Sequence, residues 1–143
     1  MGSQVGAVVD ASICAKWFFL EEHSDAALRF MSSGETFAAP DLLTAEFGNI
    51  VWKRRVRGEI REDEAVGAID AFSDLPIKLH SAIGLAQNAL AIGIAARHSF
   101  YDCLYLALAE REATKLVTAD RRLRNKLAGT AYAPLLLWIE DLP

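Results

Sequence analysis

Short apolar runs that alternate with helical patterns are the feature that most constrains the fold of this chain. Five such runs indicate strands, at residues 5–9, 37–39, 77–79, 116–118 and 135–138. The first run is β-branched, and the runs show no period-two alternation, as is typical of parallel strands covered on both faces by helices. The sequence therefore predicts an α/β protein, a three-layer sandwich with a central parallel sheet flanked by helices.

Seven segments between and after these runs indicate helices, at residues 11–18, 24–31, 41 to about 57, 62–72, 81 or 83 to 97, 102 to about 113, and 121–127. Ser24 is expected to cap the second helix. Pro40 suits the start of the third, and Gly58 its end. The segment that opens at Asp102 has almost no polar face, so it is expected to be buried on most sides.

Composition favours a single globular domain over residues 1–143. Hydrophobic residues make up 52% and charged residues 24%, which supplies an ample core. Gln87 and Asn88 interrupt the longest apolar segment, which is shorter than the ~20 residues of a spanning helix. No signal-peptide pattern is visible, so a cytoplasmic location is expected. Cys14 and Cys103 lack the spacing of a redox or zinc site and are expected to be reduced and buried.

Four acidic residues occupy unusual positions in apolar surroundings. Asp10 directly follows the first strand, and Asp120 comes two residues after the strand that ends at Thr118. Because parallel strands end at the same edge of a sheet, these carboxylates are expected to lie together. Glu46 and Asp102 stand near the starts of two helices. Carboxylates gathered in an apolar setting repel one another unless a cation lies between them.

Magnesium and manganese suit such a group because both prefer oxygen ligands. Asp10, Glu46, Asp102 and Asp120 would supply an open site of this kind. No histidine–cysteine cluster competes with it, and the isolated His23, His80 and His98 are expected to be surface or packing residues. The sequence also lacks a glycine-rich phosphate loop and a serine nucleophile elbow.

Each acid also has a simpler structural explanation. Ser99 and Asp102 match a capping box, in which Asp102 reaches back to the backbone of the N-cap residue. Asp10 and Asp120 could each cap a helix, which stabilises it by about 1 kcal/mol. Glu46 could face solvent near a helix start. Capping explains each acid alone, whereas a shared site also explains why two of them are delivered to one edge of the sheet.

The charge pattern is uneven. A net charge of −4 argues against nucleic-acid binding by bulk electrostatics. Lys and Arg are nevertheless concentrated at 53–57 and 121–126, downstream of two of the acids. At 100° per residue, Lys53 and Arg57 share the face of Glu46, where phosphates could bind, and Arg121 is a further candidate. A solvated or partner-binding face explains these cations equally well.

Four blocks of sequence together resemble the PIN-domain family, and more narrowly the VapC-type toxins. They are VVDAS at 8–12, PDLLTAE at 40–46, YDCLYLALA at 101–109 and LVTADR at 116–121. The blocks run in family order and span nearly the whole chain. Cys103 stands where the family often has alanine. Gly48 within the third helix costs about 1 kcal/mol relative to alanine, which a close helix contact would explain.

The resemblance implies a Mg²⁺- or Mn²⁺-dependent endoribonuclease, the toxin of a toxin–antitoxin pair, that inhibits translation and growth by cleaving RNA. It also implies a homodimer and a small antitoxin that occupies the active-site groove. The implied catalytic residues are Asp10, Glu46, Asp102 and Asp120, with Asp10, Asp102 and Asp120 as metal ligands, Glu46 as a ligand or the residue that orients water, and Ser12 and Thr118 as supports. Two alternatives stay open: a non-catalytic PIN-like interaction module, and a PIN nuclease of RNA maturation without an antitoxin.

Overall fold

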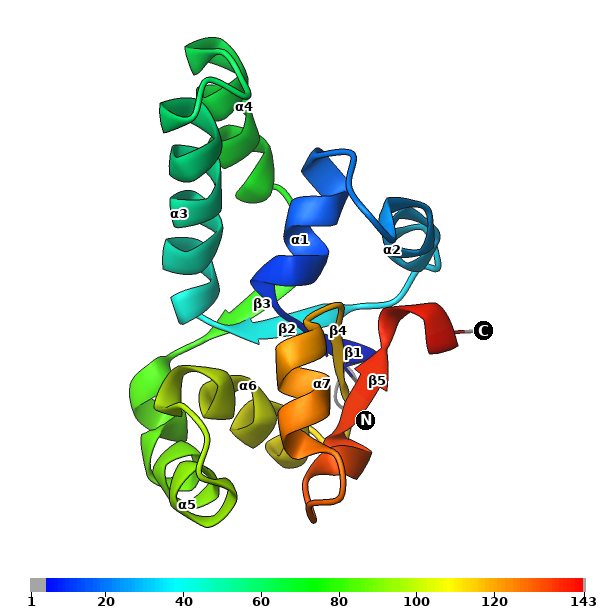
Figure 1. The fold of residues 1–143 in the computed structure, drawn as a ribbon, viewed down its shortest axis with the longest axis vertical. Helices are drawn as coiled ribbons and strands as arrows, with labels where there is room; N and C mark the ends of the chain where they lie inside the picture. Colours follow the sequence, from blue (N-terminus) through cyan, green and yellow to red (C-terminus); the bar gives the residue numbers. More distant parts are fainter. Residues whose placement is uncertain (1–4, 143) are drawn as a thin grey trace.

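The computed structural model describes residues 5–142 and contains one sheet of five parallel strands. The spatial order is β3-β2-β1-β4-β5 (Figure 1). The strands are β1 (Ala7–Val9), β2 (Phe37–Pro40), β3 (Ile77–His80), β4 (Leu116–Thr118) and β5 (Leu136–Trp138). The predicted parallel sheet is confirmed.

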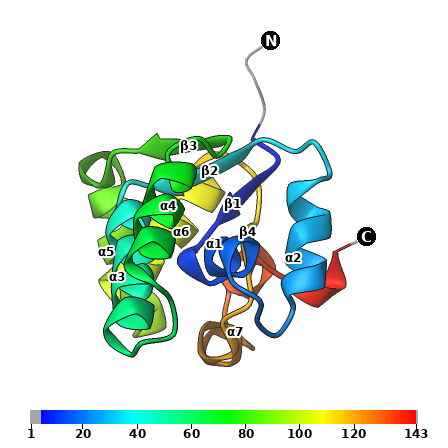
Figure 2. The ribbon, with the colours of Figure 1, turned by 90° about the horizontal axis from the view of Figure 1, so that it is seen from above.

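Helices cover both faces of this sheet and form the outer layers. They are α1 (Ala11–Phe18), α2 (Ser24–Met31), α3 (Leu42–Val56), α4 (Glu62–Phe72), α5 (Ala86–Ala96), α6 (Phe100–Arg111) and α7 (Arg121–Leu127). Short 3₁₀ turns lie at Ala82–Leu85, Ala133–Leu135 and Ile139–Asp141. The helices α1 to α4 lie above the sheet in Figure 1, with α5 and α6 below it. Figure 2 shows α7 at the edge where β4 ends.

Strand register determines which residues meet at this edge. Val9 of β1 pairs with Val117 of β4, so Asp10 and Thr118 are the next residues along the two strands. Parallel strands advance together, and the side chains that follow them therefore emerge at the same level. The register places the first acid of the chain beside the end of the fourth strand.

The core centres on α6, where every residue from Cys103 to Ala109 is buried. This confirms the expectation of a helix enclosed on most sides. Cys14 and Cys103 are free and buried, as expected. Within residues 5–142, no helix is both long and apolar enough to cross a membrane.

Local chemistry departs from the sequence-based expectation at two helix starts. Pro40 ends β2, and α3 begins two residues later at Leu42. The N-cap of α2 is His23, with a left-handed φ of 67°, and it makes no side-chain cap bond. Ser24 instead accepts a hydrogen bond from the Glu21 N–H (2.9 Å) and donates one to the Phe19 carbonyl (3.1 Å). It therefore stabilises the α1–α2 turn and does not cap α2.

The expected contact at Gly48 is also absent. A Cβ atom at this position would meet no heavy atom within 4 Å. Close packing therefore does not require glycine there. The close approach lies in α5, where a Cβ on Gly93 would come within 3.1 Å of the His98 carbonyl oxygen.

Candidate active site

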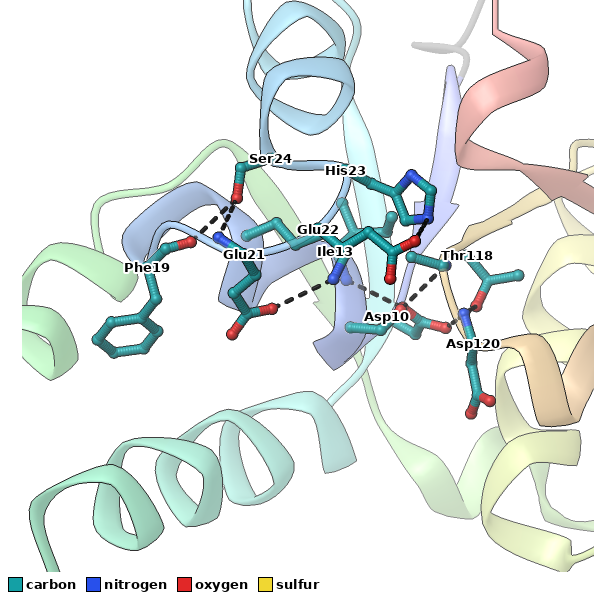
Figure 3. A network of polar contacts seen from close by, with 12 residues as sticks. Asp10, Ile13, Phe19, Glu21, Glu22, His23, Ser24, Thr118 and Asp120 are labelled. Carbon is teal, nitrogen blue, oxygen red and sulfur yellow. Dashed lines mark hydrogen bonds and ion pairs between the residues drawn. The ribbon is translucent and has the colours of Figure 1, made fainter. Parts of the chain in front are cut away.

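Asp10 lies at the carboxyl end of β1 and forms the N-cap of α1. Its Oδ1 accepts hydrogen bonds from the Ile13 N–H (3.2 Å) and the Ser12 hydroxyl (2.5 Å). Its Oδ2 accepts a hydrogen bond from the Thr118 hydroxyl at 2.6 Å (Figure 3). The residue is only 9% exposed. A carboxylate this deeply buried is stabilised in one orientation by three donors from two strand ends.

The two hydroxyl groups also fix the chain that leads to Asp120. Ser12 Oγ accepts a hydrogen bond from the Ala119 N–H (3.1 Å), and Thr118 Oγ1 accepts one from the Asp120 N–H (3.0 Å). The Ala119–Ser12 bond and the Thr118–Asp10 bond join the segment after β1 to the end of β4 and the loop that follows it. The Asp10 and Asp120 carboxylates are thereby carried by one hydrogen-bonded unit.

Asp120 is the N-cap of α7, and its Oδ1 accepts hydrogen bonds from the N–H groups of Arg122 (2.9 Å) and Leu123 (3.2 Å). The charge of Asp120 also affects the pKa of Asp10. The pKa of Asp10 is raised from 3.8 to about 6, mainly by burial and to a smaller extent by the negative charge of Asp120, while the hydrogen bonds from Ser12, Thr118 and Ile13 lower it. A cation beside these groups would favour the ionised form of both.

Glu46 and Tyr105 connect α3 to the central helix α6. The Tyr105 hydroxyl donates a short hydrogen bond to Glu46 Oε1. Burial raises the pKa of Glu46, and the charge of Asp102 raises it too, while the bond from Tyr105 lowers it. The pKa of Tyr105 is raised by burial and by the charges of Glu46 and Asp10. Tyr105 therefore remains a protonated donor between the acids.

Asp102 stands in the first turn of α6, where Ser99 is the N-cap. The Ser99 hydroxyl accepts from the Asp102 N–H at 3.4 Å, which is the first half of the expected capping box. The Asp102 carboxylate does not complete the box. Its Oδ2 contacts His98 Nε2 (2.7 Å) and the Ser99 hydroxyl (3.3 Å). His98 therefore orients this carboxylate, whereas the sequence predicted a surface or packing role for it.

The four acids form two interacting pairs. Asp120 acts on the pKa of Asp10, and Asp102 acts on that of Glu46. Within residues 5–142, no three His, Cys, Asp or Glu side chains form a group that could hold a metal by itself. The all-oxygen donor set nevertheless suits Mg²⁺, which commonly keeps several waters and uses one or two carboxylates plus substrate phosphates. The residues fit an ion that is bound partly through water.

The predicted cations differ in their surroundings. Lys53 and Arg57 line a hollow of about 300 Å³ between α1 and α3, which also includes Ser12. Arg121 is exposed and forms an ion pair with Glu22 at 2.7 Å. Lys53 and Arg57 thus lie near the Asp10 loop, whereas Arg121 has a protein partner already.

A larger cavity, about 640 Å³, lies elsewhere. Its lining includes Gly6, Phe30, Thr114 and Lys115, near the amino ends of β1 and β4. None of the four acids lines it. Chemistry and not size therefore identifies the carboxyl edge of the sheet as the candidate active site, because the carboxylates with raised pKa lie there.

Sequence reasoning missed two contributors, His98 and Tyr105. Both lie at helical spacing from Asp102, four residues before it and three residues after it. Residues at this spacing lie on one face of a helix, so the sequence could have predicted that His98 and Tyr105 lie near Asp102. The link from Tyr105 to Glu46 spans 59 residues and joins two helices that lie on opposite faces of the sheet.

A parallel α/β sandwich with paired carboxylates at the carboxyl ends of its strands defines a class of nuclease-like proteins. The chain belongs to the PIN-domain family, whose sequence profile matches residues 7–127. PIN domains are nucleases, and they generally depend on divalent metal ions. The resemblance that the four sequence blocks indicated is confirmed.

The chain is similar in sequence to two ribonucleases of this family and similar in fold to two solved structures. The chain is 36% identical to ribonuclease VapC3 of Pyrobaculum aerophilum over 121 residues, 83% of this chain and 92% of the relative. It is 32% identical to ribonuclease VapC1 of Mycobacterium tuberculosis over 118 residues, 81% of this chain and 86% of the relative. The crystal structure of PAE2754 from P. aerophilum superposes with a TM-score of 0.69 at 26% identity, over 95% of this chain and 85% of that one. The toxin VapC20 of M. tuberculosis shares the fold, with a TM-score of 0.67 at 16% identity, over 89% of this chain and 98% of that one.

Proposed function

We propose that the chain is a Mg²⁺- or Mn²⁺-dependent endoribonuclease that acts as the toxin of a toxin–antitoxin pair. It inhibits translation and growth by cleaving RNA in the cytoplasm. The observation that carries this proposal is Asp10, a buried carboxylate with a raised pKa, fixed by two hydroxyl groups at a strand end beside Asp120. A helix cap requires only the bond from the Ile13 N–H, whereas Asp10 also accepts hydrogen bonds from two hydroxyl groups.

Asp10, Asp102 and Asp120 would hold the metal directly or through water. When bound, the ion supplies an activated water and neutralises charge on the phosphate oxygens. Ser12 and Thr118 hold the Asp10 carboxylate in place through their hydroxyl groups.

Glu46 orients the attacking water or takes its proton. Its pKa is raised by burial, which brings the carboxylate closer to the range of an effective base at neutral pH. Tyr105 donates to Oε1 and so limits how the carboxylate can rotate. The other oxygen, Oε2, is left to contact water or the ion.

The proposal includes two protein partners. A small antitoxin would occupy the active-site groove; one structure of similar fold is a toxin–antitoxin complex from Klebsiella pneumoniae, at 14% identity and a TM-score of 0.64. A second copy of the chain would complete a homodimer. The helix α5 carries no charged residue and exposes Leu90 (54%) and Ile94 (70%), an apolar surface of the kind that such a contact would cover.

Cleavage of an RNA pool, with and without Mg²⁺ or Mn²⁺, tests the enzymatic proposal. Wild-type protein is expected to cleave only with metal, and Asp10→Asn is expected to lose cleavage while keeping its fold. Asp70→Asn is a matched control because Asp70 is exposed on α4, outside the site. Full activity of Asp10→Asn would refute the assignment.

The first alternative is a non-catalytic interaction module, and the observation that favours it is that Asp10 and Asp120 both serve as helix caps. Titration with Mn²⁺ separates the two proposals. Tight binding that raises the melting temperature supports the enzyme, and no binding supports the module. For the second alternative, a nuclease of RNA maturation, a short antitoxin reading frame beside the gene would count against it.

A further inference from the structure

Four cations converge on the hollow between α1 and α3. Lys16 comes from α1, Lys53 and Arg54 come from α3, and Arg57 is the C-cap of α3. Glu21 and Glu59 are the acids in the lining, so positive charge is in excess by two. The whole chain has a net charge of −4, which makes a cationic hollow a local feature and not a property of the surface in general.

Two of the cations are fixed by Glu21. Its carboxylate contacts Lys16 Nζ at 3.2 Å and forms a short ion pair with Arg54 Nη2. The Arg54 guanidinium also lies over the Phe19 ring, 4.4 Å from its centroid. The Glu21 N–H donates to Ser24, and Figure 3 shows its carboxylate extending towards α3. This wall of the hollow is therefore positioned before any ligand binds.

The other two cations are available to a ligand. Lys53 and Arg57 are exposed and lie one helical turn apart, and their side chains make no hydrogen bond or ion pair within the described range 5–142. A lysine and an arginine in this arrangement suit a tetrahedral anion, because the arginine fork and the lysine point charge can share its oxygens.

The hollow is continuous with the acidic site. Ser12 lines it and donates to Asp10 at 2.5 Å. Along α3, Lys53 lies ~10 Å and Arg57 ~16 Å beyond Glu46, at a rise of about 1.5 Å per residue. At ~3.4 Å per phosphate of a stacked strand, these spans correspond to roughly three to five nucleotides. One strand of nucleic acid can therefore reach both places.

We infer that this hollow is a phosphate subsite for single-stranded RNA, distinct from the acids that surround the scissile bond. Lys53 and Arg57 bind a backbone phosphate a few nucleotides from the cleavage point, against the wall formed by Lys16, Glu21 and Arg54. The inference rests on the proposed function for the identity of the strand. Continuity with the Asp10 loop favours RNA over an acidic peptide, because a substrate must reach Asp10 whereas a docked peptide need not.

Salt dependence of RNA binding tests this subsite without cleavage. A fluorescent 12-nucleotide RNA is titrated with protein in EDTA at several KCl concentrations. For single strands, each lost phosphate contact reduces the slope of log K against log salt by about 0.7. Lys53→Ala/Arg57→Ala removes the contact to one shared phosphate, so it should reduce the slope by about 0.7 and weaken binding about tenfold at low salt. The control is Arg55→Ala, an exposed cation on α3 that does not line the hollow.

Three further readouts decide the interpretation. With metal present, the double variant should raise KM and leave kcat nearly unchanged. Its melting temperature should match that of the wild type, because both side chains are exposed. An unchanged slope, or a loss equal to that of Arg55→Ala, overturns the subsite. A poly-glutamate peptide that binds the hollow more tightly than RNA also overturns it and assigns the hollow to a protein segment.

The two proposals fail in different ways. Absence of cleavage by wild-type protein in Mg²⁺ and Mn²⁺, with the slope still reduced in the double variant, refutes the nuclease and keeps a nucleic-acid site. Metal-dependent cleavage with an unchanged slope keeps the nuclease and refutes the subsite.

Discussion

The Thr118 hydroxyl donates a hydrogen bond of 2.6 Å to Oδ2 of Asp10, a residue 108 positions away in the sequence. The contact follows from the register of β1 and β4, which places the two residues side by side at the strand ends. Thr118 is fully buried and also accepts from the Asp120 N–H. One hydroxyl therefore positions both Asp10 and Asp120, and the site depends on the sheet for its geometry.

Thr118→Val tests this dependence with little change in volume. The variant leaves Asp10 Oδ2 and the Asp120 N–H without their partner, so the free energy of unfolding should fall by about 1–3 kcal/mol. Urea unfolding measures the change, and Thr44→Val is the control because Thr44 is exposed on α3. Equal stability of the two variants would contradict a structural role for this bond.

The stability of the metal-free protein should depend on pH through Asp10. Its pKa is raised to about 6 in the folded state, mainly by burial, against 3.8 in an unfolded chain. Between these values the folded state retains a proton that the unfolded state releases. The free energy of unfolding should therefore fall as pH rises from about 4 to 6, by up to about 3 kcal/mol, and then level off.

Asp10→Asn isolates this contribution because it cannot ionise. Urea unfolding of both proteins in EDTA, from pH 4 to 8, should show the variant gaining stability relative to wild type as pH rises. Other carboxylates affect both proteins alike. Parallel stability curves would show that the pKa of Asp10 is not raised by folding.

Tyr105→Phe removes one hydroxyl and keeps the buried ring. Without this donor the pKa of Glu46 should rise further and the carboxylate should lose its fixed orientation, so kcat should fall by roughly 10- to 100-fold. Tyr101→Phe is the control, since Tyr101 is 63% exposed. Steady-state cleavage kinetics with Mn²⁺ compare the two, and unchanged kcat in Tyr105→Phe would remove Tyr105 from the site.

The sequence correctly predicted the strands, the buried helix α6 and the acidic residues at the sheet edge, because these depend on residues close together in the chain. The apolar strands, the apolar α6 and the acids after β1 and β4 were predicted because strand burial and the geometry of parallel sheets require little else. Ser24 was misassigned because the helix begins at Ser24 itself, with His23 as the N-cap, and the Ser24 hydroxyl bonds the backbone of Phe19 and Glu21 in the preceding turn. The bond from Tyr105 to Glu46 joins residues 59 apart on helices at opposite faces of the sheet, which no local pattern encodes.

His98 should affect metal affinity through Asp102. Its Nε2 lies 2.7 Å from Asp102 Oδ2 and fixes one oxygen of that carboxylate. His98→Ala should weaken Mn²⁺ binding by roughly 10-fold or more, whereas His98→Gln, which keeps a donor, should recover part of the affinity. Isothermal titration calorimetry measures both. Identical affinities in all three proteins would mean that His98 only fills space.

Two helical glycines should respond to alanine in opposite directions. At Gly48 the new methyl group meets open space, so the intrinsic preference of helices for alanine should stabilise the protein by up to about 1 kcal/mol. At Gly93 the methyl would lie 3.1 Å from the His98 carbonyl oxygen. The His98 N–H donates to the Gly93 carbonyl at 3.1 Å, so this backbone cannot move away freely.

Gly93→Ala should therefore lower the melting temperature while Gly48→Ala raises it. Thermal unfolding measures both, and shifts in the same direction would show that the α5–α6 connection yields to the added methyl group.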